Sequence, residues 1–421
     1  MGRRRIGLWA ALAVALLAAF CWPVACTRQH ASPPPAEAST PIIRVLLLVS
    51  KDSVTLRAAT PPTVKTANQR VPLRLNVASG VETTLVLTAD GWQIGGVTVP
   101  GGRSELTLTQ AEHATVSIND KLYRGSYRFI PAGLTSFDVV NDVDVDDYLK
   151  GVLACELYKR WNEETYRAQA IVARTYALYE ARTRGAGRTW DVFPDQRSQV
   201  YGGYAEETPK SRAAAEDTAG IVIAFGPIGQ ERIFKSYFSS CCGGITQSSA
   251  DAFGDHYLTP LSDQNVHGLC NAAPQFNWGP VELTKTELTR RLRAYGARRH
   301  TGESTMANVA RLDIQAANRF NRPIRFVVID QEGTRYSLSG EELRVAVNAG
   351  ATKDSPGKLY SSFVKVINEP GSDVVRFVEG HGNGHGVGLC QFCSEARAEA
   401  GMRHEDIVLS AFPRARLVRA Y

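Results

Sequence analysis

The stretch Tyr148-Leu-Lys-Gly-Val-Leu-Ala-Cys-Glu156, followed by Ala168-Gln-Ala-Ile-Val-Ala-Arg-Thr-Tyr-Ala177, decides how this chain folds around its chemistry. The spacing of apolar residues predicts two successive helices, over residues 145–158 and 163–182. Asn162 suits the N-cap of the second helix because its side-chain oxygen can accept from a free backbone N–H.

Glu156 is the acidic residue that ends the first predicted helix, and its sequence neighbours are apolar on both sides. Poor solvation raises the pKa of a carboxyl group and lets it hold a proton near neutral pH. A general acid needs that property. The alternative is an ordinary glutamate at a helix end, exposed or paired with Arg174 or Lys150.

Composition places the chain among ordinary globular proteins. It has 421 residues, 44% of them hydrophobic and 21% charged, enough for two or three domains. The formal net charge of +6 suits a mildly anionic partner but is too small for a dedicated nucleic-acid binder. We therefore expect no nucleic-acid partner.

Residues 1–26 have the plan of an export signal. Three arginines precede an apolar run from Ile6 to Trp22, and Pro23-Val24-Ala25-Cys26 is similar to a bacterial lipobox. Lipidation of Cys26, simple cleavage and a retained membrane anchor all remain open. Each of them predicts an exported protein of the cell envelope.

The remaining chain divides by composition into three parts. Residues 27–40 are a Pro-rich linker. Residues 41–131 read mainly as strands separated by glycine turns and predict a β-rich N-terminal domain. Residues 132–421 mix both signals, so the fold class is α+β. Further helices are expected at 208–218 and 284–295, and strands at 42–49, 73–77, 84–88, 137–140, 220–225, 232–238, 324–329, 335–338 and 363–367.

Two glycine-rich segments are candidate parts of a site. Ser239-Ser-Cys-Cys-Gly-Gly244 allows close approach of the backbone to a ligand. Gly380-His-Gly-Asn-Gly-His-Gly-Val-Gly-Leu-Cys-Gln391 is costly to order, which favours a site or a turn that no side chain fits.

The histidines and cysteines near these segments leave two chemistries open. His381, Cys390 and Cys393 are candidate ligands of a zinc ion. The alternative is a disulfide that links Cys270 to either Cys241 or Cys242, with Cys242 and Cys270 as the candidate pair, although pairing cannot be deduced from sequence. We therefore expect no cofactor, with zinc as the alternative.

Residues 117–421 resemble the stage II sporulation protein D family, whose SpoIID/LytB domain is shared with amidase enhancers. The matching motifs occur in one order along the chain: Lys121-Leu-Tyr-Arg-Gly125, Val140-Asn-Asp-Val-Asp144, Asp147-Tyr-Leu-Lys-Gly-Val152, Glu156, residues 168–177, Ser198-Gln-Val-Tyr-Gly202, Ser239-Ser-Cys-Cys-Gly-Gly-Ile-Thr246, Tyr257-Leu258, Trp278, Gly384-His-Gly-Val-Gly-Leu-Cys-Gln391 and Gly401-Met402.

The resemblance implies a SpoIID-like catalytic domain over residues 132–421 that acts on bacterial peptidoglycan. Sporulation members of the family are lytic transglycosylases that cut denuded glycan strands, and their catalytic glutamate corresponds to Glu156. Arg174, Ser240, His385 and Gln391 lie in matched motifs, and we expect them to line the cleft and hold the glycan.

The chain departs from the family pattern at three places. Some members carry a Cys/His zinc cluster after the second helix, whereas residues 191–199 contain neither residue type. Ala154-Cys155 replaces the usual Pro-Ser before the glutamate. Cys393-Ser394 replaces the usual Gly-Ala that closely follows Gln391.

Three functions compete at this stage. The first is a lytic transglycosylase that uses Glu156. The second is a non-catalytic peptidoglycan-binding protein that activates a cell-wall amidase. The third is a metal-dependent hydrolase that uses His381, His385 and the nearby cysteines. The membrane is a further partner through a lipid or signal anchor.

Overall fold

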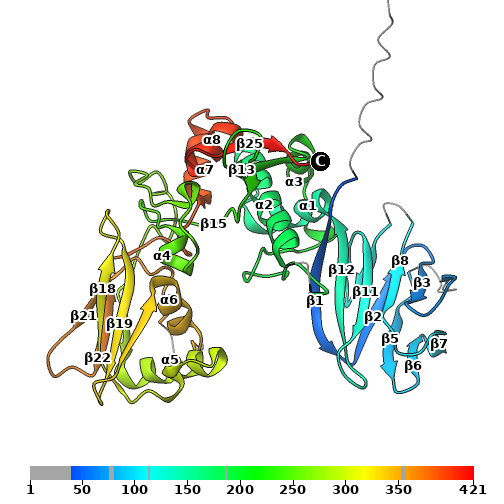
Figure 1. Cartoon of the computed structure of the whole chain (residues 1–421), viewed down its shortest axis with the longest axis horizontal. Helices are drawn as coiled ribbons and strands as arrows, with labels where there is room; N and C mark the ends of the chain where they lie inside the picture. Colours follow the sequence, from blue (N-terminus) through cyan, green and yellow to red (C-terminus); the bar gives the residue numbers. More distant parts are fainter. Residues whose placement is uncertain (1–38, 75–79, 112–113, 185–186, 352–356) are drawn as a thin grey trace, which may run out of the picture. The chain divides into compact units, whose positions relative to one another are not determined.

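The computed structural model describes residues 39–421, apart from 75–79, 112–113, 185–186 and 352–356 (Figure 1). The export signal, Cys26 and most of the linker lie outside the described residues. Within the described ranges, no helix combines the length and apolar character needed to cross a bilayer.

Residues 42–144 form two antiparallel six-stranded sheets, with strand orders β1-β12-β11-β8-β3-β4 and β10-β9-β2-β5-β6-β7. Apolar and polar residues alternate along these strands, so one face of each is buried. The indole of Trp92 is fully buried in edge-on contact with Phe129 and Phe137. The strands are β1 (Ile42–Lys51), β2 (Ser53–Ala58), β3 (Thr63–Thr66), β4 (Leu73–Arg74), β5 (Thr83–Thr88), β6 (Gly91–Ile94), β7 (Val97–Thr98), β8 (Leu106–Thr109), β9 (Val116–Ile118), β10 (Lys121–Tyr123), β11 (Ser126–Pro131) and β12 (Phe137–Asp144).

Strand β12 connects the two expected domains. It lies beyond residue 131, yet it pairs with both β1 and β11. One hydrophobic cluster continues from the sheets into the helices that follow. The expected boundary between residues 131 and 132 therefore falls within a sheet, and the division into two domains stays a prediction.

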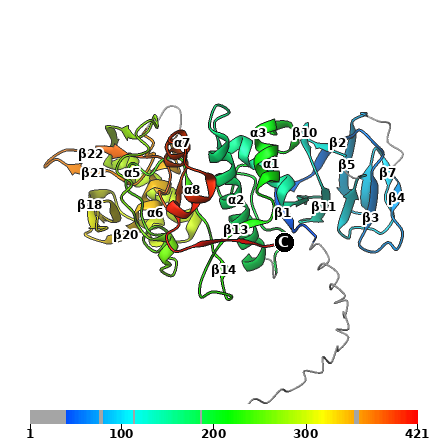
Figure 2. The same ribbon diagram turned by 90° about the horizontal axis from the view of Figure 1, so that it is seen from above.

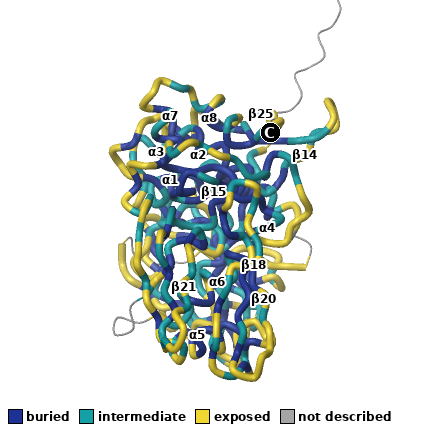
Figure 3. Tube along the Cα trace, turned by 90° about the vertical axis from the view of Figure 1, so that its left-hand side faces the viewer, coloured by how far each residue is buried: buried dark blue, intermediate teal, exposed yellow. Residues whose placement is uncertain are grey.

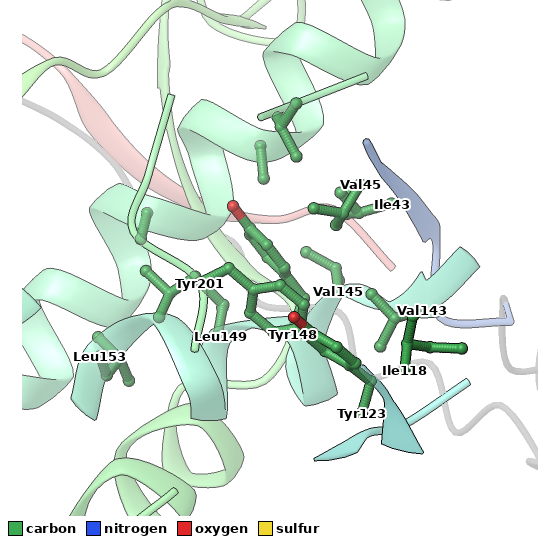
Figure 4. Packing of buried hydrophobic residues seen from close by; sticks show 14 of the residues in the cluster. Ile43, Val45, Ile118, Tyr123, Val143, Val145, Tyr148, Leu149, Leu153 and Tyr201 are labelled. Carbon is green, nitrogen blue, oxygen red and sulfur yellow. The ribbon is translucent and has the colours of Figure 1, made fainter. Parts of the chain in front are cut away.

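The two helices expected first are present as α1 (Val145–Glu156) and α2 (Glu163–Arg184). The Asn162 side chain accepts from the backbone N–H of Glu164 at 2.9 Å, so the predicted N-cap is confirmed. In Figure 4 the α1 residues Tyr148 and Leu149 pack beside Tyr201. Most of α2 is drawn as buried in Figure 3, because its small alanines contact two separate hydrophobic clusters.

The remaining elements form small sheets and short helices. β13 lies between β14 and β25, and β25 runs beside it in Figure 2. Two three-stranded sheets, β17-β22-β21 and β18-β19-β20, pack with α5 and α6 around a third cluster. The bounds are α3 (Pro209–Asp217), β13 (Ile221–Phe225), β14 (Arg232–Ile233), β15 (Phe238–Ser239), α4 (Ser249–Phe253), β16 (Asn277–Trp278), β17 (Val281–Thr284), α5 (Lys285–Arg299), β18 (Val309–Ala317), β19 (Pro323–Asp330), β20 (Arg335–Ser339), α6 (Gly340–Asn348), β21 (Lys365–Asn368), β22 (Val374–Val378), β23 (Gly380–His381), β24 (Leu389–Cys390), α7 (Gln391–Glu399), α8 (His404–Ala411) and β25 (Arg416–Arg419); the 3₁₀ turns are Tyr204–Glu206, Thr259–Leu261 and Gly302–Thr305.

These elements confirm the α+β fold class and the expected helices. The strand expected at 232–238 is wrong in its middle, because the backbone leaves β14 after Ile233 and re-enters a pairing only at Phe238. Of the strand expected at 73–77, only Leu73–Arg74 lies among the described residues.

Candidate functional site

Glu156 opens onto a cleft of about 920 Å³. One side, here called the acid side, consists of Cys155, Glu156, Leu157, Ser198 and Val200. The loop side consists of Phe238, Ser239, Ser240, Asn383, Gly384, His385 and Gln391. The remaining lining includes four aromatic rings, Tyr158, Tyr176, Tyr237 and Phe253, and the charged residues Arg197, Lys235, Asp255, Glu341, Arg344 and Lys358.

The Glu156 carboxyl is half-buried and held by two donors. The backbone N–H of Val200 donates to Oε1 at 2.9 Å, and Nε2 of Gln391 donates to Oε2 at 3.5 Å. Burial raises the pKa of Glu156 above its ordinary value, and these two hydrogen bonds lower it by less. The C-terminal end of α1 also disfavours a negative charge. Glu156 is thus suited to hold a proton and to release it.

The loop that carries Val200 is fixed by its two neighbours. Tyr148 donates its hydroxyl to Oε1 of Gln199 at 3.1 Å, and Tyr201 donates to Asn141 at 3.3 Å. Successive residues of an extended chain point to opposite sides. Because Gln199 and Tyr201 are anchored on the core side, Val200 faces the cleft. The loop lies against Gly151 of α1, where an added Cβ would come within 2.9 Å of the Gly203 carbonyl oxygen.

The loop side is built on a short parallel pairing between β15 and β24, in which Ser239 is opposite Cys390. This pairing brings Ser240 and Gln391 together although they are far apart in sequence. The Ser240 carbonyl accepts from the backbone N–H of Phe392 at 3.1 Å. The structure therefore brings Glu156, Ser240 and Gln391 into one cleft, as the sequence predicts.

His385 also lies in the cleft, where its ring contacts those of Tyr237 and Phe253. Its Nδ1 accepts from the backbone N–H of Val387 at 3.0 Å, which assigns a proton to Nε2 of the neutral ring. Burial lowers the pKa of His385 to about 4. His385 therefore presents an uncharged ring to the cleft.

Arg174 is placed differently from the prediction, because the described residues that line the cleft do not include it. Its guanidinium is fully buried. It donates to the Asp146 carboxylate at 2.7 Å and to the backbone carbonyls of Ala215 and Ile221. The expectation that Arg174 holds the glycan is therefore corrected, since its donors join α1, α3 and β13.

The predicted zinc and disulfide residues gather behind the loop side. Cys242, Cys270, Cys390 and Cys393 are buried thiols whose sulfur atoms all lie within 4.8 Å of one another. Sγ of Cys242 and Sγ of Cys270 are 3.6 Å apart, whereas a disulfide bond is about 2.05 Å long. The candidate pair is thus adjacent but unbonded here.

His381 is not part of this group in the described residues. It pairs with Asn277 in the β16–β23 ladder, and its ring contacts Phe363. Residues 191–199 contain neither Cys nor His, and two of their carboxylates are held in ion pairs, Asp191 by Arg44 and Asp195 by Arg197.

Sequence reasoning missed the aromatic and charged parts of the cleft. Tyr237 stacks on Phe253 at 4.6 Å between ring centroids and donates to Asp255 at 2.9 Å. Lys235 pairs with Glu180 and lies over the rings of Tyr176 and Tyr237. The available signal was that Lys235 and Tyr237, two residues apart, lie on the same side of an extended segment. This spacing does not show whether that side faces a cleft or an open surface.

This arrangement defines a class: an α+β protein with one weakly hydrated glutamate in an open cleft of aromatic and hydrogen-bonding side chains. Residues 134–225, which include Glu156 and all of α1 and α2, match the family model described as SpoIID, Stage II sporulation protein. The chain carries a SpoIID domain, so the resemblance seen in the sequence is confirmed, and a cell-wall-related function is supported.

Three curated relatives extend the match beyond that domain. An uncharacterized protein of Brachyspira hyodysenteriae is 27% identical over 85% of this chain and 82% of its own. The amidase enhancer of Bacillus subtilis is 24% identical over 63% of this chain, which spans only 39% of that relative's length. Stage II sporulation protein D of Bacillus amyloliquefaciens is 22% identical over 73% of this chain and 83% of its own.

Proposed function

We propose that the protein is a peptidoglycan lytic transglycosylase that cleaves denuded glycan strands and leaves 1,6-anhydromuramic ends. The observation that carries this proposal is the position of Glu156. Its carboxyl has a raised pKa and opens onto a cleft of about 920 Å³.

One carboxyl group can perform both steps of this reaction. Protonated Glu156 donates its proton to the glycosidic oxygen as the bond from C1 of the muramic acid breaks. The resulting carboxylate then accepts the proton of the same sugar's 6-hydroxyl while O6 bonds to C1. The proton returns to Glu156, and no water is consumed. A second carboxylate, which hydrolytic glycosidases require, is unnecessary.

The other cleft residues suit a neutral polyol. Aromatic faces pack against the C–H faces of sugar rings, and Tyr237, Phe253 and Tyr158 offer such surfaces. The amide of Gln391 supplies a hydrogen bond, and neutral His385 adds a ring without an unpaired charge. These roles are part of the proposal.

The second candidate is a non-catalytic activator of a cell-wall amidase. The relative named amidase enhancer, which matches 63% of this chain, favours it. In this function the same cleft would bind glycan, and Glu156 would act only as a hydrogen-bond acceptor.

Digestion of purified denuded glycan strands separates the candidates. Wild type should release strands with 1,6-anhydromuramic ends, detected by mass spectrometry, and Glu156→Gln should release none above background. Glu206→Gln is the matched control, because Glu206 is exposed, lies on the 3₁₀ turn after the Val200 loop and is not in the cleft lining. Reducing ends would mean hydrolysis. Glycan binding by both proteins without cleavage would favour the activator.

We further propose an exported, envelope-associated location, which rests on residues 1–26. Fractionation of cells with and without Cys26→Ser tests the lipid anchor. Wild type in the membrane fraction and the variant released from it would support lipidation of Cys26. An unchanged distribution would contradict it.

A further inference from the structure

Four buried thiols form one compact group behind the loop side of the cleft. They come from three distant segments: Cys242 follows β15, Cys270 lies in the loop before β16, and Cys390 and Cys393 flank the start of α7. Each has an exposed fraction of 5% or less. A buried group of this kind is inaccessible to the glycan and needs a separate explanation.

The sulfur separations match those of a tetrahedral metal site. Zinc–sulfur bonds of about 2.3 Å place the corners of a regular tetrahedron about 3.8 Å apart. Sγ of Cys242 lies 3.6 Å from Sγ of Cys270 and 3.9 Å from Sγ of Cys393. All four sulfur atoms lie within 4.8 Å of one another. The group therefore has room for one central ion and too little for two.

A pair of disulfides explains this arrangement less well. A sulfur atom can form only one disulfide, yet Cys242 is nearly equidistant from two partners. A bonded pair would also need its sulfur atoms to approach to about 2.05 Å. An ion at the centre uses all four thiols at their present spacing.

The surroundings supply what a metal thiolate centre needs. Cys390 is the N-cap of α7, and its sulfur accepts from the backbone N–H groups of Cys242 and Cys393, each at 3.4 Å. Hydrogen bonds of this kind stabilise the sulfur of a bound thiolate.

Arg322 supplies a buried positive charge beside the group. Its guanidinium is fully buried, and its described hydrogen bonds go to three carbonyl oxygens, those of Cys242, Ile245 and His385. A zinc ion with four thiolates carries a net charge of −2. Such a centre would provide the opposite charge that a buried guanidinium requires.

We propose that Cys242, Cys270, Cys390 and Cys393 bind one Zn²⁺ as a closed structural site. The ion would join the three segments that form the loop side, because Cys242 lies two residues after Ser240 and Cys390 directly precedes Gln391. It would fix both side chains relative to Glu156 and leave no coordination position open for chemistry.

Metal analysis of the purified full chain tests this proposal independently of any catalytic activity. We expect one zinc per chain in the wild type and a loss to background in Cys242→Ser. Cys241→Ser is the matched control, because Cys241 is the adjacent buried cysteine and lies outside the group of four. It should keep its zinc. Folded wild type without stoichiometric zinc, or with iron in its place, would overturn the proposal.

A second measurement does not depend on the folding of any variant. Titration of native wild type with a mercurial reagent should release one zinc as four thiols react, and exchange with Co²⁺ should give the absorption of a tetrahedral cobalt thiolate. Peptide mapping under non-reducing conditions completes the test. Two disulfides among these four cysteines would overturn the proposal.

Discussion

The two sides of the cleft are held in place by different forces. The acid side rests on α1 and the Val200 loop, whose Tyr148 and Tyr201 belong to a continuous apolar core. The loop side is also packed, through Leu389 and Phe392, against hydrophobic clusters, and it adds backbone pairing, glycines and the thiol group. The glutamate is thus carried mainly by the hydrophobic packing of α1, whereas Gln391 is carried by a segment that adds backbone pairing and thiol contacts to its apolar packing.

Gly388 illustrates how tightly the loop side is constrained. It has φ +69°, and an added Cβ would clash with the carbonyl oxygen of Tyr237. The acid side should therefore survive changes that disturb the loop side.

Arg174→Met should give the largest loss of stability, about 3–5 kcal/mol, because it removes a buried charged donor from Asp146 and from two carbonyl oxygens. Urea denaturation measures it. Arg182→Met, an exposed arginine of the same helix, should change stability by less than about 0.5 kcal/mol. Equal effects of the two variants would show that Arg174 does not hold the acid side together.

Glu156→Gln should lower glycan cleavage at least ~100-fold while leaving the fold intact. The pKa of Glu156 is higher in the folded chain than in the unfolded chain. Above the folded-state pKa the ionised carboxyl therefore lowers the stability of the fold. Below the unfolded-state pKa the carboxyl is protonated in both states and has no such effect. The variant should therefore be at least as stable as wild type at pH 7, and the difference should vanish as the pH falls to about 4. Thermal melts at both pH values measure this. A variant that is less stable at pH 7 would contradict a weakly hydrated Glu156.

His385 gives a smaller, pH-dependent effect on the loop side. Its folded-state pKa is about 4, below the ordinary value of 6.5. As the pH falls from 6.5 toward 4, the unfolded chain takes up this proton first, so His385 costs the fold stability across that window. His385→Phe should flatten this part of the stability curve. Denaturation at pH 4, 5 and 7 tests it, and an unchanged slope would place the ring in contact with bulk water.

Gln391→Leu should give the smallest change. It removes the donor that lies 3.5 Å from Glu156 and lowers the pKa of that carboxyl. The alkaline limb of the pH–rate profile of cleavage should therefore move to higher pH. The zinc content of the protein should stay the same. Gln196→Leu, at an exposed glutamine of the same cleft, is the control. A shift of the limb to lower pH would contradict the hydrogen bond.

Sequence reasoning predicted the acid side well because its signals are local. Helical periodicity located α1 and α2, and the apolar neighbours of Glu156 indicated its poor solvation. Arg174 was misassigned, since a motif shows that a residue matters but not whether it contacts solvent or core. Only the fold could bring Asp146, Ala215 and Ile221 around its guanidinium.

The loop side could be predicted only in part. Its glycine spacing marked an ordered loop, but the four thiols are separated by up to 151 residues. The β15–β24 pairing brings Cys242 to Cys390, and a bridge between Ile245 and Asn265 brings in the loop of Cys270. The same long-range folding places Tyr237 and Phe253 in the cleft. No spacing rule connects such positions before the topology is known.

Direct titration of the Glu156 carboxyl tests the central claim. NMR of protein labelled with ¹³C at the glutamate carboxyl carbon, with the signal assigned by its absence in Glu156→Gln, gives this pKa in the folded chain. We expect a pKa above the ordinary 4.5 of glutamate. A value at or below 4.5 would mean that Glu156 is already ionised at neutral pH in a well-hydrated setting, and it would contradict its role as the acid.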